Sequence, residues 1–525
     1  MNPLASIAHA RRVLTTLSAL TLIVFSIACG SNNSPAPNNS GFTNSNLSGT
    51  YVVAISGTDA TGNGSFFAVA GTISADGKGN ITGGTLDIND LALGGTGVFA
   101  AQAVSASAYN VSSDGRGTAR IVTSALTFSI DFVLTSNTHG LVTRFDGNGS
   151  GSGTLDLQGT ATQSSLTSLA FSVSGADSAQ TPLASVGAFT LNSSGTITSG
   201  TQDLNDGGSS AGLTALPVTG SLTLTSGTLG TAQINTSFGS LGFDAWVIDS
   251  THLKLIETDA TGLALSGDAF TQQTTFTAGQ LIFTILGFDS SQNPLAAGGF
   301  ATTDVNGTLS AGIEDYNDAG TTGSVPAFTG SCTTFVAGRC QLALTGFSNG
   351  AFGNYVFAAY PSSGGVQLLE IDSLGITSGV GYPQTATSFA SSVGYGLNLT
   401  GSNINGEVDD IGQFNATSTN VTGILDENDI TAPIGDIQLS GTYLPDSPAT
   451  GRGSITVPTI GTLIGTLNLE YYVVNSSTAL LLEGDSEQAT VGSFQLQSTP
   501  GGAIAQSHMS LMHPIVRPHG ALKRK

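Results

Sequence analysis

Tyr51-Val-Val-Ala-Ile-Ser-Gly-Thr-Asp59 carries large apolar side chains at Tyr51, Val53 and Ile55 and mostly small ones between them. This alternation is typical of a β-strand with one buried face, because successive side chains of a strand point to opposite sides. The same pattern, ending on Gly-x-Asp or Gly-x-Asn, returns in residues 169–177, 281–289 and 395–403. The repeat of about 112 residues predicts four copies of one β unit.

Three further landmarks follow in the same order within each copy. The first is Asp-x-Asn-Asp, found at Asp87, Asn89 and Asp90; Asp203, Asn205 and Asp206; Asp315, Asn317 and Asp318; and Asp426, Asn428 and Asp429. The second is a Gly-Arg turn at Arg116, Arg339 and Arg452, where the second copy has Leu229. The third is a closing Glu-x-Asp at Glu257, Glu370 and Glu483, which becomes Arg144-Phe-Asp146 in the first copy.

The stretches between the landmarks predict an all-β protein. They are short runs rich in Val, Ile, Leu, Phe and Thr, and none has sustained helical periodicity. About eight strands per copy, joined by hairpin-length turns, fit an antiparallel β-barrel or a two-sheet β-sandwich. We favour the barrel, because closure removes exposed strand edges. The predicted repeats are residues 46–158, 159–273, 274–386 and 387–500, each large enough to be a self-sufficient domain on a string.

The N-terminal residues predict export and a lipid anchor. Arg11-Arg12 precedes an apolar run that ends at Cys29, so residues 1–28 are expected to be a signal peptide. Ser26-Ile27-Ala28-Cys29 resembles the lipobox of bacterial lipoproteins, although Ser26 stands where that family usually has leucine. The resemblance implies a diacylglycerol on Cys29, and Gly30 after it implies the outer membrane or cell surface; the alternative is ordinary secretory cleavage. Residues 29–45, rich in Ser, Asn and Pro, predict a flexible tether.

Two cysteines remain in the body once Cys29 is assigned to the lipid. Cys332 and Cys340 lie on either side of Ala337-Gly338, which is a turn signal. They could face each other across a hairpin and form a disulfide in an oxidising envelope. The alternative is a pair of buried thiols.

Charge excludes one large class of partners. All 35 acidic residues lie between positions 41 and 500, where the cations are Lys78, Arg116, Arg120, Arg144, Lys254, Arg339 and Arg452. Such a body repels nucleic acid, so we expect no nucleic-acid partner and contact with the membrane only through the lipid anchor. Residues 501–525 contain no acid and end in Lys523-Arg524-Lys525, which predicts a disordered basic tail.

Catalysis has little support in the sequence. His139 and His252, the histidines of the body, each lie in a Ser/Asn/Thr-rich segment that suggests a polar turn. The closing motifs contain carboxylate pairs that could serve a glycoside hydrolase as acid and base, namely Glu370 with Asp372 and Glu483 with Asp485. An active site rarely occurs in several equivalent copies of one chain, however. We therefore expect no enzymatic activity.

The repeated Asp-x-Asn-Asp is the sharpest candidate for a binding site. In an extended segment Asp87 and Asn89 point to one side and Asp90 begins a turn, which brings hard oxygen atoms together. With few cations nearby, all four motifs are candidate calcium sites. The alternative is that these side chains cap backbone N–H groups in a tight turn. The arginine of the Gly-Arg turn could pair with the closing Glu-x-Asp of its own unit.

The body resembles a tandem repeat of uncharacterised bacterial envelope lipoproteins, through Gly49-Thr-Tyr51, Asp76-Gly-Lys-Gly-Asn80, Asp87-Ile-Asn-Asp90 and Asp114-Gly-Arg-Gly117. That family implies no activity. The leading hypothesis is a non-enzymatic surface lipoprotein that serves as a spacer, in adhesion or as an envelope binding module. The alternative is a protein that binds a glycan or small ligand at barrel mouths, although a single tryptophan, Trp246, disfavours glycans. A carboxylate-dependent glycoside hydrolase is the third hypothesis.

Overall fold

The computed structural model describes residues 41–60, 64–207, 210–347, 355–403, 405–430, 432–458 and 465–498. The expected signal peptide, Cys29, most of the tether and the basic tail lie outside the described residues. The described residues belong to one compact unit of β-strands and short 3-10 helices, η1 (Asn44–Asn46), η3 (Leu91–Leu93) and η4 (Gln163–Ser165). Within these ranges, no helix has the length and apolar character that a membrane span requires.

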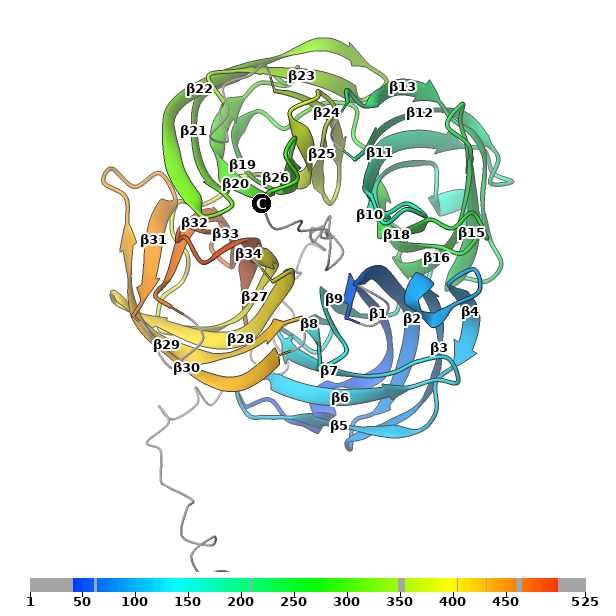
Figure 1. Cartoon of the computed structure of the whole chain (residues 1–525), viewed down its shortest axis with the longest axis horizontal. Coiled ribbons are helices and arrows are strands. Elements are labelled where there is room, and N and C mark those ends of the chain that lie inside the picture. Colours follow the sequence, from blue (N-terminus) through cyan, green and yellow to red (C-terminus); the bar gives the residue numbers. More distant parts are fainter. Residues whose placement is uncertain are drawn as a thin grey trace, which may run out of the picture. The chain divides into compact units, whose positions relative to one another are not determined.

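The strands form four successive antiparallel barrels, called barrels 1 to 4, which confirms the predicted all-β class (Figure 1). Barrel 1 contains β1 (Ser48–Asp59), β2 (Ser65–Asp76), β3 (Asn80–Asp90), β4 (Val98–Ala103), β5 (Ser107–Val111), β6 (Arg116–Val122), β7 (Thr127–Leu134), β8 (His139–Asp146) and β9 (Gly149–Leu157). Barrel 2 contains β10 (Ser168–Ala176), β11 (Pro182–Leu191), β12 (Ile197–Asp206), β13 (Leu213–Pro217), β14 (Thr219–Leu224), β15 (Leu229–Asn235), β16 (Ser240–Asp249), β17 (His252–Glu257) and β18 (Ala264–Thr271).

Barrels 3 and 4 have one strand fewer. Barrel 3 contains β19 (Gly279–Asp289), β20 (Pro294–Thr303), β21 (Leu309–Asp318), β22 (Thr321–Val336), β23 (Arg339–Thr345), β24 (Val356–Ser362), β25 (Gly365–Glu370) and β26 (Gly375–Pro383). Barrel 4 contains β27 (Val393–Asn403), β28 (Glu407–Thr417), β29 (Asn420–Asp429), β30 (Ala432–Pro445), β31 (Arg452–Val457), β32 (Leu467–Asn475), β33 (Thr478–Glu483) and β34 (Gln488–Leu496). The predicted count of about eight strands per copy is therefore confirmed.

Each barrel is built by pairing its first strand with both its second and its last. In barrel 1, Tyr51 of β1 lies opposite Ile73 of β2 and opposite Leu157 of β9. The extra strand of barrels 1 and 2 arises where the long fourth strands β22 and β30 of the other barrels are interrupted. In barrel 2 the interruption follows Pro217, which has no N–H to donate to a strand ladder.

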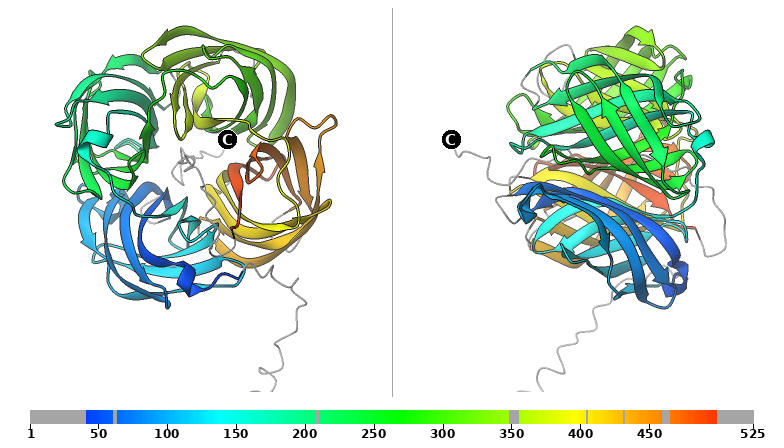
Figure 2. Two further views of the ribbon diagram at one scale, coloured as in Figure 1. Left: turned by 180° about the vertical axis from the view of Figure 1, so that it is seen from behind. Right: turned by 90° about the vertical axis from the view of Figure 1, so that its right-hand side faces the viewer.

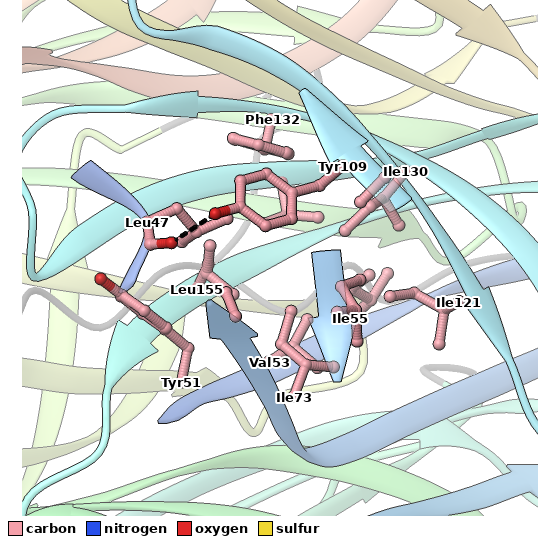
Figure 3. Packing of buried hydrophobic residues seen from close by; sticks show 14 of the residues in the cluster. Leu47, Tyr51, Val53, Ile55, Ile73, Tyr109, Ile121, Ile130, Phe132 and Leu155 are labelled. Atoms are coloured by element: carbon pink, nitrogen blue, oxygen red, sulfur yellow. Dashed lines mark hydrogen bonds between the residues drawn. The ribbon is translucent and has the colours of Figure 1, made fainter. Parts of the chain in front are cut away.

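The period-two face of each opening strand points into its own barrel. Tyr51, Val53 and Ile55 are at most 1% exposed and belong to the core cluster of barrel 1 (Figure 3). In the same cluster Tyr109 Oη donates to the backbone oxygen of Leu47 (2.7 Å). Barrels 2, 3 and 4 have core clusters of their own. The alternating pattern thus specifies four separate hydrophobic cores.

Further apolar clusters lie between barrels. The second strand of each barrel contacts late strands of the next, so that β2 contacts β17 and β18, β11 contacts β24 and β25, β20 contacts β33 and β34, and β28 contacts β7, β8 and β9. Because β28 belongs to barrel 4 and its partners to barrel 1, the contacts form a closed cycle. Phe66 with Trp246 and Leu286 with Leu482 are buried in such shared clusters. The barrels, drawn from two more sides in Figure 2, therefore differ from the expected domains on a string.

Cys332 and Cys340 are joined by a disulfide with a Cα–Cα distance of 5.4 Å. Cys332 lies on β22 and Cys340 on β23, and these neighbouring strands pair in antiparallel register. Cys340 is fully buried in the core cluster of barrel 3. The bond therefore ties a hairpin of barrel 3 to the core of the same barrel.

Candidate functional site

The Asn of every Asp-x-Asn-Asp motif lies at a contact between two barrels. Asn89 Nδ2 of barrel 1 donates to the backbone oxygens of Glu257 (3.1 Å) and Leu263 (2.9 Å) in barrel 2. Equivalent bonds run from Asn205 to Glu370 and Gly375, from Asn317 to Glu483, Asp485 and Gln488, and from Asn428 to Arg144, Asp146 and Gly149. Each Asn thus holds the closing loop of the next barrel, and Asn428 of barrel 4 holds that of barrel 1.

The first Asp of the motif is also held from the next barrel. Asp203 Oδ2 lies 2.7 Å from Arg339 Nε and also accepts a hydrogen bond from Tyr360 Oη. Arg452 and Tyr472 make the same contacts with Asp315. The prediction that each arginine pairs with the closing Glu-x-Asp of its own unit is therefore wrong for Arg339 and Arg452, because each pairs with an Asp across the barrel contact. Arg452 also pairs with Asp446 and Glu470 of its own barrel, neither of which belongs to the closing motif.

The two remaining contacts use other donors for the first Asp. Asp426 of barrel 4 lies 3.5 Å from Arg116 Nη1 of barrel 1. Asp87 faces barrel 2, which has Leu229 at the arginine position, and accepts a hydrogen bond from Trp246 Nε1 (2.8 Å) instead. Burial raises the pKa of Asp87, and burial together with Asp87 raises the pKa of Asp244 to about 7. This contact therefore holds two carboxyl groups without a matching cation.

The residues of the candidate calcium sites make different contacts. The Asn and the first Asp of each motif are engaged by the neighbouring barrel, whereas the last Asp has a different environment; Asp90 Oδ1 accepts from the backbone N–H of Ala92 (2.9 Å). Over the ranges that the structure describes, no group of three or more His, Cys, Asp or Glu residues could hold a metal ion. The contacts of the motif are those of an element that joins barrels.

One end of barrel 4 is hollowed into a cavity of about 200 Å³. We call this end the mouth; it is where the end of β27, the end of β29 and the turn between β33 and β34 meet. Five carboxylates line the cavity, namely Glu427, Asp429, Glu483, Asp485 and Glu487. No Lys, Arg or His is among the described residues that line it. The mouth of barrel 4 is therefore strongly acidic.

Two of these carboxylates lie at the end of β29 and repel each other. Glu427 is only 6% exposed, and its side chain lines the cavity. Asp429 Oδ2 accepts from Asn405 Nδ2 (2.9 Å), but Asp429 Oδ1 is buried without a partner among the described residues. Burial and the nearby Asp429 raise the pKa of Glu427 to about 7. Burial and Asp485 raise the pKa of Glu483 well above its usual range.

Sequence reasoning did not single out Glu427, although a signal was present. The second position of Asp-x-Asn-Asp is Ile88, Leu204 and Tyr316 in the first three copies, and only the fourth has an acid there. In a strand this position alternates with the two residues that face the neighbouring barrel, so its side chain points to the barrel's own interior. The sequence signal for this site was therefore an acid, Glu427, in one copy at a position that is apolar or aromatic in the other three.

Barrel 1 carries a cation of its own at the equivalent mouth. Arg144 replaces the closing Glu, and its side chain is 1% exposed. Its Nη1 lies 3.3 Å from Asp59 Oδ2, and its Nε lies 3.3 Å from Asp146 Oδ1. The guanidinium also lies 4.8 Å from the ring centroid of Phe67, within the range of a cation–π contact. Arg144 therefore pairs with Asp59 and Asp146 from within the barrel, whereas burial and Asp59 raise the pKa of Asp90 at the same mouth to about 7.

The closing Glu residues of barrels 2 and 3 are buried acids with raised pKa values. Burial and Asp259 raise the pKa of Glu257 to about 9. Burial and Asp372 raise the pKa of Glu370 well above its usual range, and Glu370 Oε2 accepts from Thr377 Oγ1 (2.7 Å). Low-dielectric surroundings therefore disfavour the charged form of both side chains.

The two histidines of the body are buried partners of acids, which differs from the expected polar turns. His139 Nδ1 lies 2.6 Å from Asp156 Oδ1. His252 Nε2 and Lys254 Nζ lie 2.7 Å and 2.8 Å from Asp268 Oδ1. Burial lowers the pKa of His252.

No family model matches the chain, and no curated protein matches it either. Among solved structures it is similar to a mutant of Transferrin Binding Protein B, a vaccine antigen from Haemophilus parasuis Hp5, with 9% identity and a TM-score of 0.19 over 71% of this chain and 83% of that chain. It is also similar to intact Ap-TbpB with its N and C lobes, with 9% identity and a TM-score of 0.17 over 69% and 84% of the two chains. Values this low carry no functional argument.

Proposed function

We propose that this chain is a lipid-anchored protein of the bacterial outer membrane or cell surface, and that its four barrels act together as a binding module. The observation that carries this proposal is the closed cycle of barrel contacts, in which Asn428 of barrel 4 donates to the backbone oxygens of Arg144 (2.7 Å) and Gly149 (2.8 Å) in barrel 1. A spacer gains length from barrels that follow one another freely. Barrels that share buried surface and return to the first instead hold their loops in fixed relative positions, which favours binding.

The proposal includes the absence of enzymatic activity. Glu370 and Glu483, the acids that could serve a glycoside hydrolase, are at most 1% exposed. Glu370 exchanges a hydrogen bond with its own partner Asp372, whereas the two carboxyl groups of a glycosidase stand about 5 Å or more apart, on either side of the scissile bond. These pairs are better suited to holding a shared proton within the fold than to reaching a substrate.

A second candidate function, small-ligand binding at a barrel mouth, is favoured by the cavity of barrel 4. Under this hypothesis, the binding site lies inside barrel 4 and not on the outer surface that all four barrels share. The two candidates are compatible, because a rigid module can present a mouth as well as a surface.

The lipid anchor is tested by metabolic labelling with a palmitate analogue in a bacterial host that processes lipoproteins. We expect the wild-type chain to carry the label and to sediment with outer membranes, because a thioether-linked diacylglycerol holds it there. Cys29→Ser should abolish both. The double substitution Cys332→Ala with Cys340→Ala is the matched control and should keep the label. An unlabelled wild-type chain would contradict the proposed anchor.

A further inference from the structure

We infer that the mouth of barrel 4 binds a small organic cation with guanidinium or ammonium groups. The inference rests on the proposed binding function and names the ligand class of one site. Three features of the mouth carry it: buried carboxylate oxygens that have no donor among the described residues, the cation that barrel 1 holds in the same place, and a small cavity whose described acids form no metal-binding group.

Buried carboxyl groups at the cavity call for a donor. Glu427 lines the cavity and is 6% exposed, and Asp429 Oδ1, in the same cavity wall, is buried without a partner among the described residues. The carboxyl group of Asp410, on the neighbouring strand β28, is 1% exposed and has one oxygen without a partner. Polar groups at such depth are normally hydrogen-bonded, because a lost bond to water is otherwise not replaced. A donor that enters the cavity would satisfy Asp429 Oδ1 and offset the repulsion between Glu427 and Asp429.

Barrel 1 shows which donor fits this fold. Arg144 on β8 and Glu483 on β33 are equivalent, since each lies opposite a core residue of the preceding strand, Ile130 and Leu469 respectively. The Arg144 guanidinium lies between Asp59 and Asp146. In barrel 4 the cation is replaced by an acid, while Asp429 and Asp485 keep the places of Asp90 and Asp146. A guanidinium or ammonium group from solution would occupy the place that the Arg144 guanidinium fills in barrel 1.

Two observations favour an organic cation over a metal ion. Calcium requires six to eight oxygens at about 2.3–2.6 Å, and no described group of acids could hold a metal ion. The cavity of about 200 Å³ is smaller than the roughly 300–1,000 Å³ of typical ligand pockets. It suits a short amine whose donors reach separate carboxylates. Barrels 2 and 3 have Leu204 and Tyr316 in place of Glu427, so the site belongs to barrel 4.

The test is isothermal titration calorimetry of the full chain carrying Cys29→Ser, with agmatine and with putrescine, in low-salt buffer at pH 8. We expect saturable binding at one site per chain. Glu427→Gln should weaken it by about tenfold or more, because a neutral amide replaces one of the few charges that face the ligand. Asp318→Asn, at the mouth of barrel 3, is the matched control and should bind like the parent. Binding should also weaken between pH 8 and pH 6, as Glu427 becomes protonated.

The second variant introduces a positive charge inside barrel 4. Glu483→Arg places a guanidinium where barrel 1 has Arg144 and should abolish binding, while the circular dichroism spectrum and cooperative melting show that the chain still folds. Absence of heat with both amines, equal affinity in Glu427→Gln, or binding of calcium in place of the amines would each overturn the inference. These outcomes leave the labelling of Cys29 unaffected, so failure of the site and failure of the proposed surface function are distinguishable.

Discussion

Arg339 shows how much a contact between barrels can depend on one side chain. It is 5% exposed, and the Asp203 carboxylate that it meets from barrel 2 is fully buried. A buried ion pair is not by itself a strong stabiliser, since both charges lose water. Removing one partner, however, leaves the other charge buried and uncompensated. The contact between barrels 1 and 2 has no arginine at this position, and Trp246 Nε1 donates a hydrogen bond to Asp87 there instead.

We expect Arg339→Ala to lower the free energy of unfolding by about 3–5 kcal/mol, the usual cost of breaking a buried pair from one side. Urea denaturation followed by circular dichroism measures it. Arg120→Ala is the control, because Arg120 is exposed, and it should change stability by no more than about 0.5 kcal/mol. Equal effects of the two substitutions would show that the Asp203 contact contributes nothing.

At the scale of elements, the sequence predicted the strands well, but it did not predict which barrel the arginine side chains contact. Alternation identified the faces of β1, β10, β19 and β27 that form the cores, because burial on one side leaves a period of two. The repeat could not show whether Arg339 meets an acid of its own unit or of its neighbour, since both pairings recur with the same period. The sequence signal for the contact across barrels was the replacement of arginine by Leu229 in the second copy, which is also the copy that contains Trp246. The site at Glu427 was likewise marked by one departure within a repeat.

Asn317 tests the joining role of the motif. Its Nδ2 donates to the backbone oxygens of Glu483 (3.0 Å), Asp485 (2.8 Å) and Gln488 (2.8 Å). Asn317→Ala should destabilise the chain by about 1–3 kcal/mol, because buried acceptors lose their donor. It should also speed amide hydrogen exchange in the turn between β33 and β34. Asn306→Ala, at an exposed turn of the same barrel, is the control. Unchanged exchange in that turn would contradict the joining role.

At the scale of the whole molecule, the contact that closes the cycle is chemically unlike the others. At the positions where β2, β11 and β20 carry Ala68, Ala184 and Ala296, β28 carries Asp409, which is fully buried against barrel 1 and accepts from Ser150 Oγ (2.6 Å). Glu407, two residues earlier on the same strand, is also fully buried. Burial raises the pKa of Asp409 to about 6 and that of Glu407 well above its usual range. The closing contact therefore contains buried carboxyl groups whose charged form is disfavoured.

Carboxyl groups whose pKa values are raised in the folded chain predict that its stability falls as pH rises. Burial raises the pKa values of Asp131 and Glu470 to about 7 and that of Glu257 to about 9, well above the values near 4 expected in the unfolded chain. Between pH 4 and these raised pKa values, the folded chain binds more protons than the unfolded one. The contribution of these groups to stability is therefore fully present below about pH 4 and is lost as pH rises through their pKa values in the folded chain. The melting temperature should therefore fall between pH 5 and pH 9.

Glu257→Gln separates this cause from a general effect of net charge. An amide imitates the protonated acid, so the substitution should leave the melting temperature nearly unchanged at pH 5 and raise it at pH 9, because no buried charge then has to form. Asp76→Asn is the control; Asp76 is half-buried at the end of β2, hydrogen bonds from Asn80 lower its pKa, and its contribution is lost only in stronger acid. Thermal denaturation by circular dichroism at pH 5, 7 and 9 measures all three chains. A melting temperature that rises with pH, or the same decline in Glu257→Gln as in the wild type, would mean that the buried carboxyl groups do not set the stability of the closed cycle.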